Sequence, residues 1–430
     1  MNNLANELNA MLDATVAGRL LSGLGRRLYF PKGIIVQSAE AKKAAYRANA
    51  TIGMAYDKGV PLILPAIADA IPALSPAEIV GYAPTAGVEA TRVSWKKRIL
   101  AKNPAISDDD LSLPVVVPGL TAGISYTADL FFDEHTSIIM SKPHWDNYEL
   151  IFQERRGANI AAIPFFGAGS GLDRNAISRA MKEAAKSGAV RIILNFPNNP
   201  AGYAPTLDEV DALVTLIDGI ARGGADVLVL CDDAYFGLFY EDTVSRESLF
   251  TRLATLHERV LAIKIDGPTK EDYVWGFRIG FVTLGSRGLK AEHHDALIKK
   301  YMGAIRSSVS CSNTPAQYLL MHSLEDGRTV SERERFYTLL KNRYQVVRRF
   351  VDGHSSPRLR ALPFNSGYFM SFHCVGVKAG DLRRELLEKH GIGTIAFGDD
   401  YLRIAFASLD EALIEGVYQT IYETADALGA

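Results

Sequence analysis

Short apolar runs alternate with amphipathic segments through the middle of the chain. The runs are rich in Val and Ile and offer an apolar surface on both sides of an extended chain. Such runs are typical of parallel strands that helices cover on both faces. The pattern therefore predicts an α/β fold, with a three-layer α/β/α core around a mainly parallel sheet. The predicted strands are LPVVVPG (113–119), SIIMSK (137–142), ANIAAIPFF (158–166), VRIILNFP (190–197), DVLVLCDD (226–233), VLAIKIDG (260–267) and FRIGFVTLG (277–285).

Three hydroxyl residues mark the starts of predicted helices. Ser75, Thr206 and Ser408 each precede a Glu by three residues. At this spacing the hydroxyl and the Glu can cap the first helical turn reciprocally. We therefore expect a helix to begin directly after each of them, and the second of these helices connects two predicted strands.

The pattern changes after about residue 325. Charge density rises in SERERFYTLLKNRYQVVRRFVDG (331–353), and shorter strand-like pieces follow in SGYFMSFHC (366–374) and YLRIAFAS (401–408). We expect a large cofactor-binding domain over residues 46–325 and a smaller α+β domain over 326–430. Residues 1–45 look helical and then extended, and we expect them to pack beside the smaller domain.

Composition narrows the class of partner. The 430 residues are 48% hydrophobic and 22% charged, with a formal net charge of -2, so no charged field attracts nucleic acid or a membrane surface. No segment approaches the roughly 20 apolar residues that span a bilayer. The three cysteines are widely spaced, which suits a reducing compartment. We expect a soluble cytoplasmic protein without a metal site, whose partners are small molecules or a second copy of the chain.

The stretch DGPTKEDYVWGFRIGF (266–281) contains two candidate site residues. Lys270 follows a Gly-Pro turn at the end of a predicted strand, where its amine would lie beside a cleft. Arg278 lies between two glycines, and its fork of donors suits a phosphate. An exposed loop lysine and a structural ion pair are the alternative interpretations. Lys264, inside an apolar run, is expected to be a strand-edge or pairing residue.

Polar residues follow two other predicted strands. Asn199 lies in the turn LNFPNNPAGYAPT (194–206), where its amide can point into the crevice at the carboxyl end of the sheet. Asp232 ends a buried run, and a buried carboxylate needs a metal or a protonated nitrogen as its partner. The histidines are scattered, so an organic cation such as a pyridinium is the better candidate.

Two further stretches have weaker signals. GLTAGISYTADLFF (119–132) places small residues and hydroxyls at a strand-to-helix junction, where free backbone amides favour an anion. KPHWDNY (142–148) places Trp145 after a proline turn, where its ring would stack on a planar cofactor or fill the core.

Taken together, these motifs resemble the aspartate aminotransferase superfamily, the fold type I enzymes that use pyridoxal 5′-phosphate. The resemblance covers the chain from about residue 29 onward, with five motifs in the family's order. It implies that Lys270 forms the Schiff base with the cofactor and then moves the substrate proton. Asp232 resembles the aspartate that keeps the pyridine nitrogen protonated. Asn199 and Tyr235 resemble the pair that hydrogen-bonds the phenolic oxygen.

The same resemblance assigns the cofactor phosphate. Arg278 resembles the arginine that binds it, Gly123 and Ile124 lie near the amides that cradle it, and Thr269 resembles the hydroxyl residue before the lysine. Tyr82, in GYAPTAG (81–87), resembles the tyrosine that reaches the phosphate of the neighbouring subunit, which implies a homodimer.

Substrate binding is assigned in the same way, and two positions depart from the family pattern. Trp145 resembles the ring that stacks on the pyridine, and Arg403 resembles the arginine that clamps the substrate α-carboxylate. Gly267 stands where the family often has a phosphate-binding serine, so one phosphate contact is expected to be lost. Ser308 stands where dicarboxylate-specific members have an arginine, and Arg306 is displaced by two positions, so aspartate is not inferred as the substrate.

These features predict a transaminase that moves an amino group from an L-amino acid to a 2-oxo acid. A carbon–sulfur lyase on the same fold is the alternative, because the same cofactor supports β-elimination. A cofactor-sensing transcription regulator is disfavoured, because the net charge is near neutral and the first forty residues contain no DNA-binding module.

Overall fold

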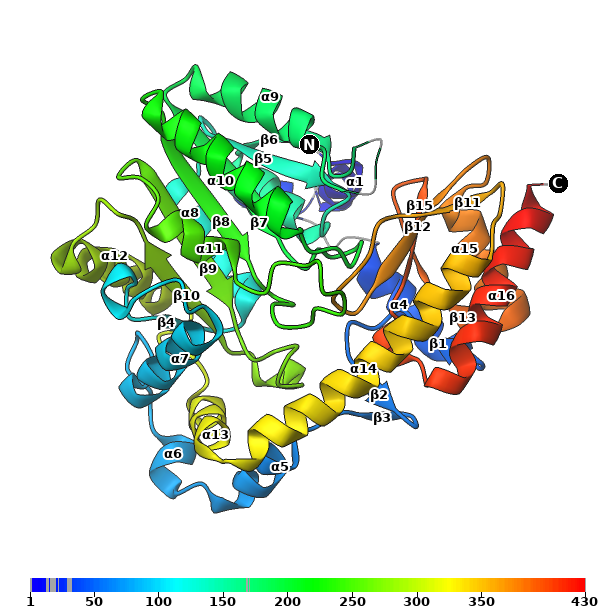
Figure 1. The fold of residues 1–430 in the computed structure, drawn as a ribbon, viewed down its shortest axis with the longest axis horizontal. Coiled ribbons are helices and arrows are strands. Elements are labelled where there is room, and N and C mark those ends of the chain that lie inside the picture. Colours follow the sequence, from blue (N-terminus) through cyan, green and yellow to red (C-terminus); the bar gives the residue numbers. More distant parts are fainter. Residues whose placement is uncertain are drawn as a thin grey trace.

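The computed structural model describes residues 2–12, 15, 21, 23–28, 33–167, 169 and 171–429. Figure 1 shows a large sheet wrapped by helices on one side of the molecule and a smaller sheet on the other. The long helix α14 (Arg328–Gly353) runs between these two parts. The two parts have different hydrophobic cores. The small sheet and α14 share one hydrophobic cluster, and each face of the large sheet packs against a separate cluster.

All seven predicted strands form one sheet, which confirms the expected fold class. Its order is β4-β10-β9-β8-β7-β5-β6, and every neighbouring pair is parallel except the two that involve β10. β10 starts three residues later than the apolar run predicts. The strands are β4 (Val115–Val117), β5 (Ser137–Lys142), β6 (Asn159–Pro164), β7 (Ala189–Asn195), β8 (Asp226–Asp232), β9 (Val260–Asp266) and β10 (Gly280–Gly285).

Helices cover both faces of this sheet. In β8, Val227 and Val229 pack on one face and Leu228 and Leu230 on the other, as the alternation of side chains along a strand requires. The middle of β8, from Val227 to Cys231, is therefore apolar on both faces. One face carries α7 (Glu89–Lys102), α9 (Arg174–Ala185), α10 (Leu207–Arg222), α11 (Leu249–Ala254) and α13 (Thr314–Glu325); the other carries α8 (Leu120–Phe131), α12 (Ala291–Arg306) and the π-helix Glu149–Glu154.

Two of the three predicted capping boxes form. The hydroxyls of Ser75 and Thr206 accept from the backbone amides three residues later, at the starts of α6 (Pro76–Val80) and α10. The third prediction is wrong. Ser408 ends a short 3-10 turn, and its hydroxyl donates to the carbonyls of Asn49 and Ala405. The helix α16 (Glu411–Leu428) starts after Asp410 instead.

The smaller sheet is antiparallel throughout, in the order β11-β12-β15-β14. Helices α14, α15 and α16 pack with it in one apolar cluster. Residues from near the start of the chain join this part, because β1 pairs in parallel with β13. The elements are β1 (Ala48–Asn49), β11 (Leu359–Ala361), β12 (Met370–Cys374), α15 (Ala379–His390), β13 (Ile392–Gly393), β14 (Ile395–Phe397) and β15 (Tyr401–Ile404).

Helix α4 (Ile34–Ala44) is fastened to the smaller sheet. The side-chain amide of Gln37 donates to the carbonyl of Ala396 and accepts from its backbone amide, both at 2.8 Å. Glu40 forms an ion pair with Arg383 of α15. The segment expected to be extended is therefore helical here, and its position is fixed by contacts with residues more than 340 positions away.

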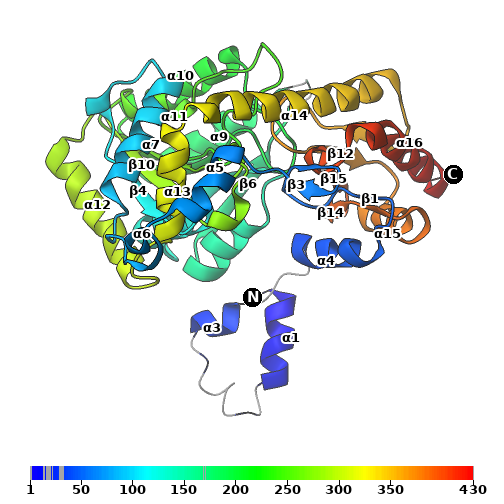
Figure 2. The same ribbon diagram turned by 90° about the horizontal axis from the view of Figure 1, so that it is seen from below.

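Among the other elements, α5 lies at the lower edge of the molecule in Figure 1, with β2 and β3 below α14, and α1 and α3 lie together beside the N-terminus in Figure 2. No helix within the described ranges is long and apolar enough to cross a membrane. These elements are α1 (Asn3–Leu12), α3 (Gly23–Arg27), β2 (Tyr56–Asp57), β3 (Val60–Pro61) and α5 (Pro65–Ala70).

Candidate active site

A cavity of about 320 Å³ lies between the carboxyl ends of the central strands and the smaller sheet. Residues from α4, the ends of β8 and β9, the start of α8 and strand β15 all reach it. All the predicted site residues line it except Gly123 and Tyr82. Those that line it are Ile124, Trp145, Asn199, Asp232, Tyr235, Thr269, Lys270, Arg278 and Arg403.

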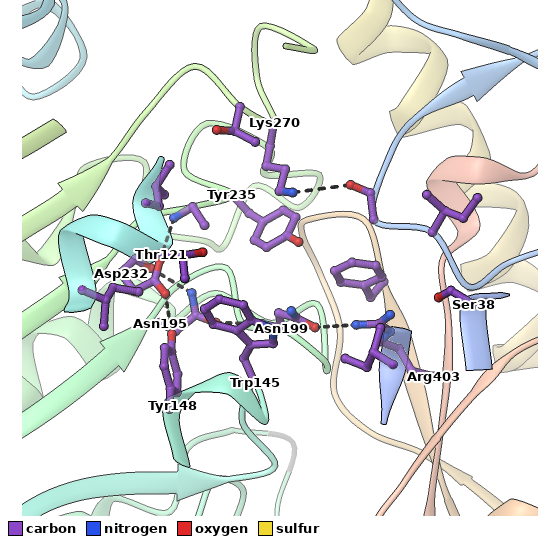
Figure 3. Close-up of a pocket in the computed structure, with 18 of the residues that line it drawn as sticks. Ser38, Thr121, Trp145, Tyr148, Asn195, Asn199, Asp232, Tyr235, Lys270 and Arg403 are labelled. Atoms are coloured by element: carbon purple, nitrogen blue, oxygen red, sulfur yellow. Dashed lines mark hydrogen bonds between the residues drawn. The ribbon is translucent and has the colours of Figure 1, made fainter. Parts of the chain in front are cut away.

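Lys270 points into this cavity from the loop after β9 (Figure 3). Its Nζ lies 3.4 Å from the carbonyl oxygen of Gly53 and 5.4 Å from the centre of the Tyr235 ring. Burial lowers the pKa of Lys270 to about 8, and the positive charges of Arg278 and Arg403 act in the same direction. About a tenth of the amine is therefore neutral near pH 7, far more than for a lysine of ordinary pKa, and the neutral amine is the form that attacks a carbonyl carbon.

Asp232 ends β8 with both carboxylate oxygens engaged. Oδ1 accepts from the amide of Ala234 at 3.2 Å, and Oδ2 accepts a short hydrogen bond from the Tyr148 hydroxyl. Burial raises the pKa of Asp232 to about 6, while the bond from Tyr148 opposes this rise. Tyr148 is itself held by Trp145, whose ring meets it edge to face at 5.5 Å. The carboxylate is thus oriented toward the cavity and kept ionised near neutral pH.

We expect the Tyr148→Phe variant to fold normally and to lose its affinity for the cofactor at a higher pH than wild type as the pH is lowered. The hydroxyl stabilises the ionised carboxylate, so its removal raises the pKa of Asp232. Loss of one hydrogen bond to a charged group costs about 1.5–3 kcal/mol, which corresponds to a shift of one pH unit or more. The protein should therefore lose cofactor affinity at a higher pH than wild type as the pH falls. Calorimetric titration of the cofactor into the apoprotein between pH 5 and 8 measures this limit.

Tyr126→Phe is the matched control for this change, because the Tyr126 hydroxyl bonds Ser308 and lies outside the cavity lining. If Tyr148→Phe and wild type lost cofactor affinity at the same acidic pH, the Tyr148 hydroxyl would not be stabilising the ionised carboxylate of Asp232.

The residues where β4 turns into α8 form a candidate anion site. The first residues of α8, Leu120 and Thr121, line the cavity together with Thr269 and Arg278. The start of a helix favours an anion, because its first amides have no partner within the helix. Gly119 precedes the helix with φ of 90°, and a Cβ there would lie 2.5 Å from a guanidinium nitrogen of Arg278. Glycine is needed at this turn so that Arg278 can approach the helix start.

Two glycines have packing roles instead of anion contacts. The amide of Gly123 donates to the carbonyl of Gly119, and a Cβ at Gly123 would lie 3.2 Å from Ile265, against the sheet. Thr121, two residues earlier, takes the place on the cavity wall that we expected for Gly123. A Cβ at Gly267 would lie 2.9 Å from Leu120, so the serine frequent in the family has no room here.

Arg403 lines the cavity on the side opposite Lys270, so both sides of the cavity carry a cationic side chain. Nη1 donates to Oδ1 of Asn199 at 2.9 Å, Nη2 donates to the carbonyl of Thr51 at 3.1 Å, and the guanidinium lies 4.3 Å from the Phe369 ring centre. Its Nε is buried with no hydrogen-bond partner among the described residues. Burial lowers the pKa of Arg403 to about 10. A buried guanidinium with a spare donor is suited to a carboxylate ligand.

Besides Gly123, three positions considered from the sequence lie outside the cavity lining of a single chain, namely Tyr82, Arg306 and Ser308. Tyr82 is 94% exposed. Arg306 ends α12 and is exposed, and the Ser308 hydroxyl bonds Tyr126 and the carbonyls of Ala304 and Ile305. Neither residue approaches the substrate side of the cavity within this chain.

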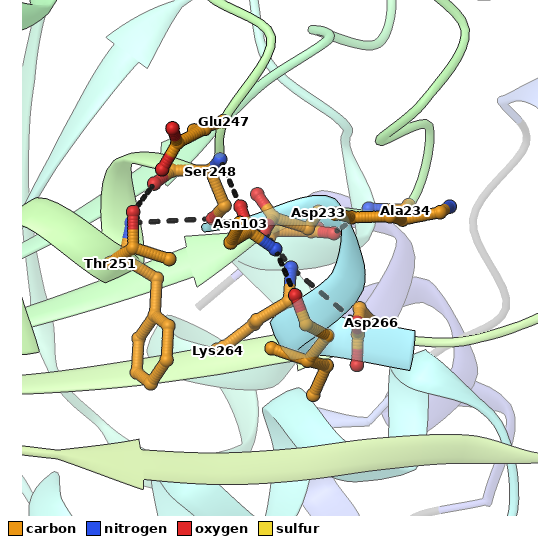
Figure 4. Close-up of polar contacts among 12 residues, drawn as sticks. Asn103, Asp233, Ala234, Glu247, Ser248, Thr251, Lys264 and Asp266 are labelled. Atoms are coloured by element: carbon orange, nitrogen blue, oxygen red, sulfur yellow. Dashed lines mark hydrogen bonds and ion pairs between the residues drawn. The ribbon is translucent and has the colours of Figure 1, made fainter. Parts of the chain in front are cut away.

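Lys264 belongs to a separate buried cluster (Figure 4). It is 1% exposed in the central strand β9, and its amine forms ion pairs with Asp233 and Asp266. Asp233 also accepts from Ser248 at 2.6 Å. Lys264 is therefore a pairing residue, as one of the two alternatives predicted, and it does not lie at a strand edge.

The residues that follow Lys270 are clamped by two helices. Asp272 has a fully buried side chain, and it pairs with Arg98 of α7 at 2.7 Å and with Arg333 of α14. Glu271 pairs with Arg98 at 2.6 Å and with Lys102. The Tyr368 hydroxyl donates to the carbonyl of Lys270 at 2.6 Å. These contacts fix the backbone on the C-terminal side of Lys270, so its side chain is aimed by a rigid segment.

Several cavity residues were not predicted. Tyr148 follows Trp145 by three positions, the spacing at which two residues of one helical turn lie on the same face. Asn195 ends β7, and its Oδ1 accepts from the backbone amide of Asn199 at 2.8 Å. The polar residue at the end of that apolar run was the available signal. Ile34 and Ser38 had no such signal, because only the docking of α4 brings them to the cavity.

The cavity residues fit pyridoxal 5′-phosphate. Asp232 offers a buried carboxylate for a ring nitrogen, Lys270 an amine of lowered pKa for the aldehyde carbon, and Arg278 with the start of α8 a site for the phosphate. The described residues contain no group of three or more His, Cys, Asp or Glu side chains that could hold a metal ion.

Comparison with known proteins agrees with this geometry. The sequence profile of the family described as "Aminotransferase class I and II" matches residues 53–421. A probable N-acetyl-LL-diaminopimelate aminotransferase of Bacillus subtilis (strain 168) is 24% identical over 356 residues, which cover 79% of this chain and 80% of that protein. An aspartate aminotransferase of Thermococcus kodakarensis is 28% identical over 232 residues, 54% of this chain and 51% of that protein.

Solved structures share the fold. An aminotransferase from Anaerococcus prevotii superposes with a TM-score of 0.83 at 22% identity, covering 94% of this chain and 98% of that one. A kynurenine aminotransferase from Pyrococcus horikoshii superposes with a TM-score of 0.79 at 17% identity, covering 96% and 98%. The chain belongs to the class I and II aminotransferases, and it is a pyridoxal 5′-phosphate-dependent transaminase, as the sequence motifs predicted.

Proposed function

We propose that Lys270 holds the cofactor covalently as a Schiff base and, when released by the incoming amino acid, moves the proton at the substrate Cα. The observation that supports this most directly is a buried lysine amine, with its pKa lowered to about 8, in the same cavity as the carboxylate of Asp232. Bound pyridoxal 5′-phosphate supplies a carbon that condenses with amines and a protonated ring that withdraws electrons from the substrate Cα.

The other cavity residues have distinct proposed roles. Asp232 would accept the hydrogen bond of the ring N–H, and Asn199 and Tyr235 would bond the phenolic oxygen. Arg403 would bind the substrate α-carboxylate with two donors, which holds the Cα–H bond in a fixed direction relative to Lys270. Trp145 would pack against the ring.

The phosphate would be held by a second set of residues. Arg278 and Thr269 line the cavity beside the first turn of α8, so a phosphate there would receive a charged fork, a hydroxyl and helix amides.

The test is an absorbance spectrum of the holoenzyme as single L-amino acids are added without an acceptor. Transamination predicts that a suitable amino acid converts the visible band of the cofactor, and that a 2-oxo acid added afterwards restores it. Release of pyruvate and ammonia, with the band unchanged at the end of the reaction, would contradict transamination and favour the lyase alternative.

We also propose that the working enzyme is a homodimer in which Tyr82 reaches the phosphate site of the partner subunit. Tyr82 is exposed beside Val80 and Ile79, both on α6, and Ile71 adds a further exposed apolar side chain. Water-exposed apolar groups of this kind are typical of an interface. Light scattering should therefore give twice the chain mass of 47.0 kDa. A catalytically active species of 47.0 kDa would contradict the dimer.

The domain division and the compartment are proposals as well. Residues 46–325 and 326–430 would form the large and small domains, and residues 1–45 would pack with the small one. The contacts of Gln37 and Glu40 support this for α4, whereas Arg27 of α3 donates to the carbonyl of Glu154 in the large part. Crystal structures with and without ligand would check this division, since the two parts should move relative to each other as rigid bodies.

We also propose that the protein lies in the reducing cytoplasm. All three cysteines are unpaired in the described structure, which supports this proposal. Cell fractionation tests the compartment.

A further inference from the structure

The cationic side chains in the described lining of one chain all have other proposed partners, so none is left for the substrate side chain. Three cationic side chains line the cavity: Lys270, Arg278 and Arg403. Under the proposed function, on which this inference rests, the first two bind the cofactor and the third binds the α-carboxylate. No fourth cation lies among the described lining residues. Within the described lining of one chain, a buried side-chain carboxylate would therefore have no counter-charge, which is costly.

The wall of the cavity next to Arg403 is mostly apolar. It is formed by Ile34 and Ser38 of α4, by Ile52 and by Phe369. Ile34 and Ser38 are four positions apart, so they lie on one face of α4. Gln37, between them in sequence, is fixed by its two hydrogen bonds to Ala396. These bonds fix the rotation of the helix about its axis, so that the neutral side chains of Ile34 and Ser38 line the cavity; Ser38 is labelled in Figure 3 on the side of Arg403.

A negative charge lies near the same wall. Asp146 follows Trp145, and its charge acts on Arg403. A Cβ built on Gly33, at the start of α4, would lie 2.8 Å from Oδ2 of Asp146. Asp146 therefore lies where α4 meets the large part of the molecule. A second carboxylate bound nearby would be repelled by it, whereas an uncharged side chain would not.

We infer that the amino-group donor is an L-amino acid with an uncharged, largely apolar side chain, and that Ile34 and Ser38 of α4 contact this side chain and determine specificity. Aspartate and glutamate are then poor donors. Ile34 supplies apolar contact area to the substrate, while Ser38 leaves room for it.

The experiment compares half-reactions of the holoenzyme. L-leucine, L-methionine and L-phenylalanine are each mixed with the enzyme, and the rate of conversion of the cofactor band is compared with the rates for L-aspartate and L-glutamate. We expect the apolar donors to be favoured roughly tenfold to hundredfold in kcat/KM, the ratio for one missing hydrogen-bonded charge partner. Faster conversion by aspartate or glutamate would overturn the inference and leave transamination intact. No conversion by any amino acid would overturn both.

A variant pair tests the role of α4 itself. Ser38→Arg places a cation on the wall, and we expect it to raise the kcat/KM ratio of aspartate to leucine at least about tenfold. Ser38→Ala keeps the wall neutral and should leave the ratio unchanged. Calorimetry with 4-methylpentanoate and with glutarate gives a readout without turnover, in which the first should bind wild type more tightly and the second should gain affinity in Ser38→Arg. An unchanged ratio and unchanged glutarate affinity in Ser38→Arg would show that α4 does not contact the substrate.

Discussion

Lys270→Ala abolishes transamination if Lys270 carries the cofactor and moves the substrate proton. A positioned acid–base group contributes about 10²- to 10⁴-fold, and loss of the covalent link removes a second contribution. We therefore expect kcat to fall by at least about 10⁴-fold. We expect the variant to fold, because alanine is smaller than lysine and the ion pairs of Glu271 and Asp272 still hold the backbone after position 270. Steady-state assay of the amino acid product measures the loss.

A control for Lys270→Ala is provided by Lys299→Ala on the outer face of α12, where Lys299 forms an exposed ion pair with Asp295. This variant should have wild-type kcat. Mass spectrometry after borohydride reduction adds a chemical readout, since the cofactor should remain attached to the peptide that contains Lys270 in wild type and to no peptide in Lys270→Ala. Turnover by Lys270→Ala within tenfold of wild type would rule out the assigned role.

Asp232→Asn should have the second largest effect. An asparagine amide has nearly the same shape as the carboxylate, but it has no charge with which to hold a protonated ring nitrogen. Breaking a buried ion pair costs about 3–5 kcal/mol, which corresponds to about 10²- to 10³-fold or more in rate. We expect a loss of about 10³-fold in kcat/KM, together with weaker cofactor binding. Stopped-flow measurement of the half-reaction and calorimetric titration of the apoprotein separate these two effects.

The neighbouring Asp233 supplies the matched control. Asp233 is also buried, but it is not among the residues that line the cavity, and it pairs with Lys264 (Figure 4). Asp233→Asn should lower the free energy of unfolding, because Lys264 then keeps only Asp266 as an acidic partner, while the protonation of the cofactor ring stays the same. Equal loss of half-reaction rate in both variants would mean that the effect of Asp232→Asn is structural.

The large sheet could be predicted because its strands are buried on both faces. Residues such as Val227 to Cys231 must then be apolar without interruption, and few other structures produce that pattern. The residues that end these strands could be predicted for the same reason, since Asp232 is conspicuous after an apolar run. The local sequence was thus sufficient to predict a site residue where that residue directly follows a buried strand.

The smaller part and the substrate wall depend on contacts between distant segments. Ile34 and Ser38 reach the cavity only because Gln37 bonds Ala396, and nothing within residues 33–44 indicates that partner. Ser408 has a good capping sequence, but its hydroxyl bonds the carbonyl of Asn49 instead. In both cases a tertiary contact decides the outcome, and a local pattern cannot report it.

Arg278 shows a third kind of limit. The apolar run around it predicted a strand, but Arg278 has φ of 53°, in the left-handed region, and β10 begins at Gly280. The turn directs the guanidinium to the start of α8 beside Gly119. Sequence identified the residue and its chemistry, whereas the backbone conformation that aims it follows from how β10 and α8 pack.

Amino-group transfer is tested most directly by following labelled nitrogen in a single tube. The holoenzyme is incubated with ¹⁵N-labelled L-leucine and unlabelled phenylpyruvate, and the products are analysed by mass spectrometry. We expect ¹⁵N-labelled phenylalanine and 4-methyl-2-oxopentanoate in equal amounts, with neither product in Lys270→Ala. Recovery of the label as free ammonium, without labelled phenylalanine, would contradict the assignment of this cavity as the site of amino-group transfer.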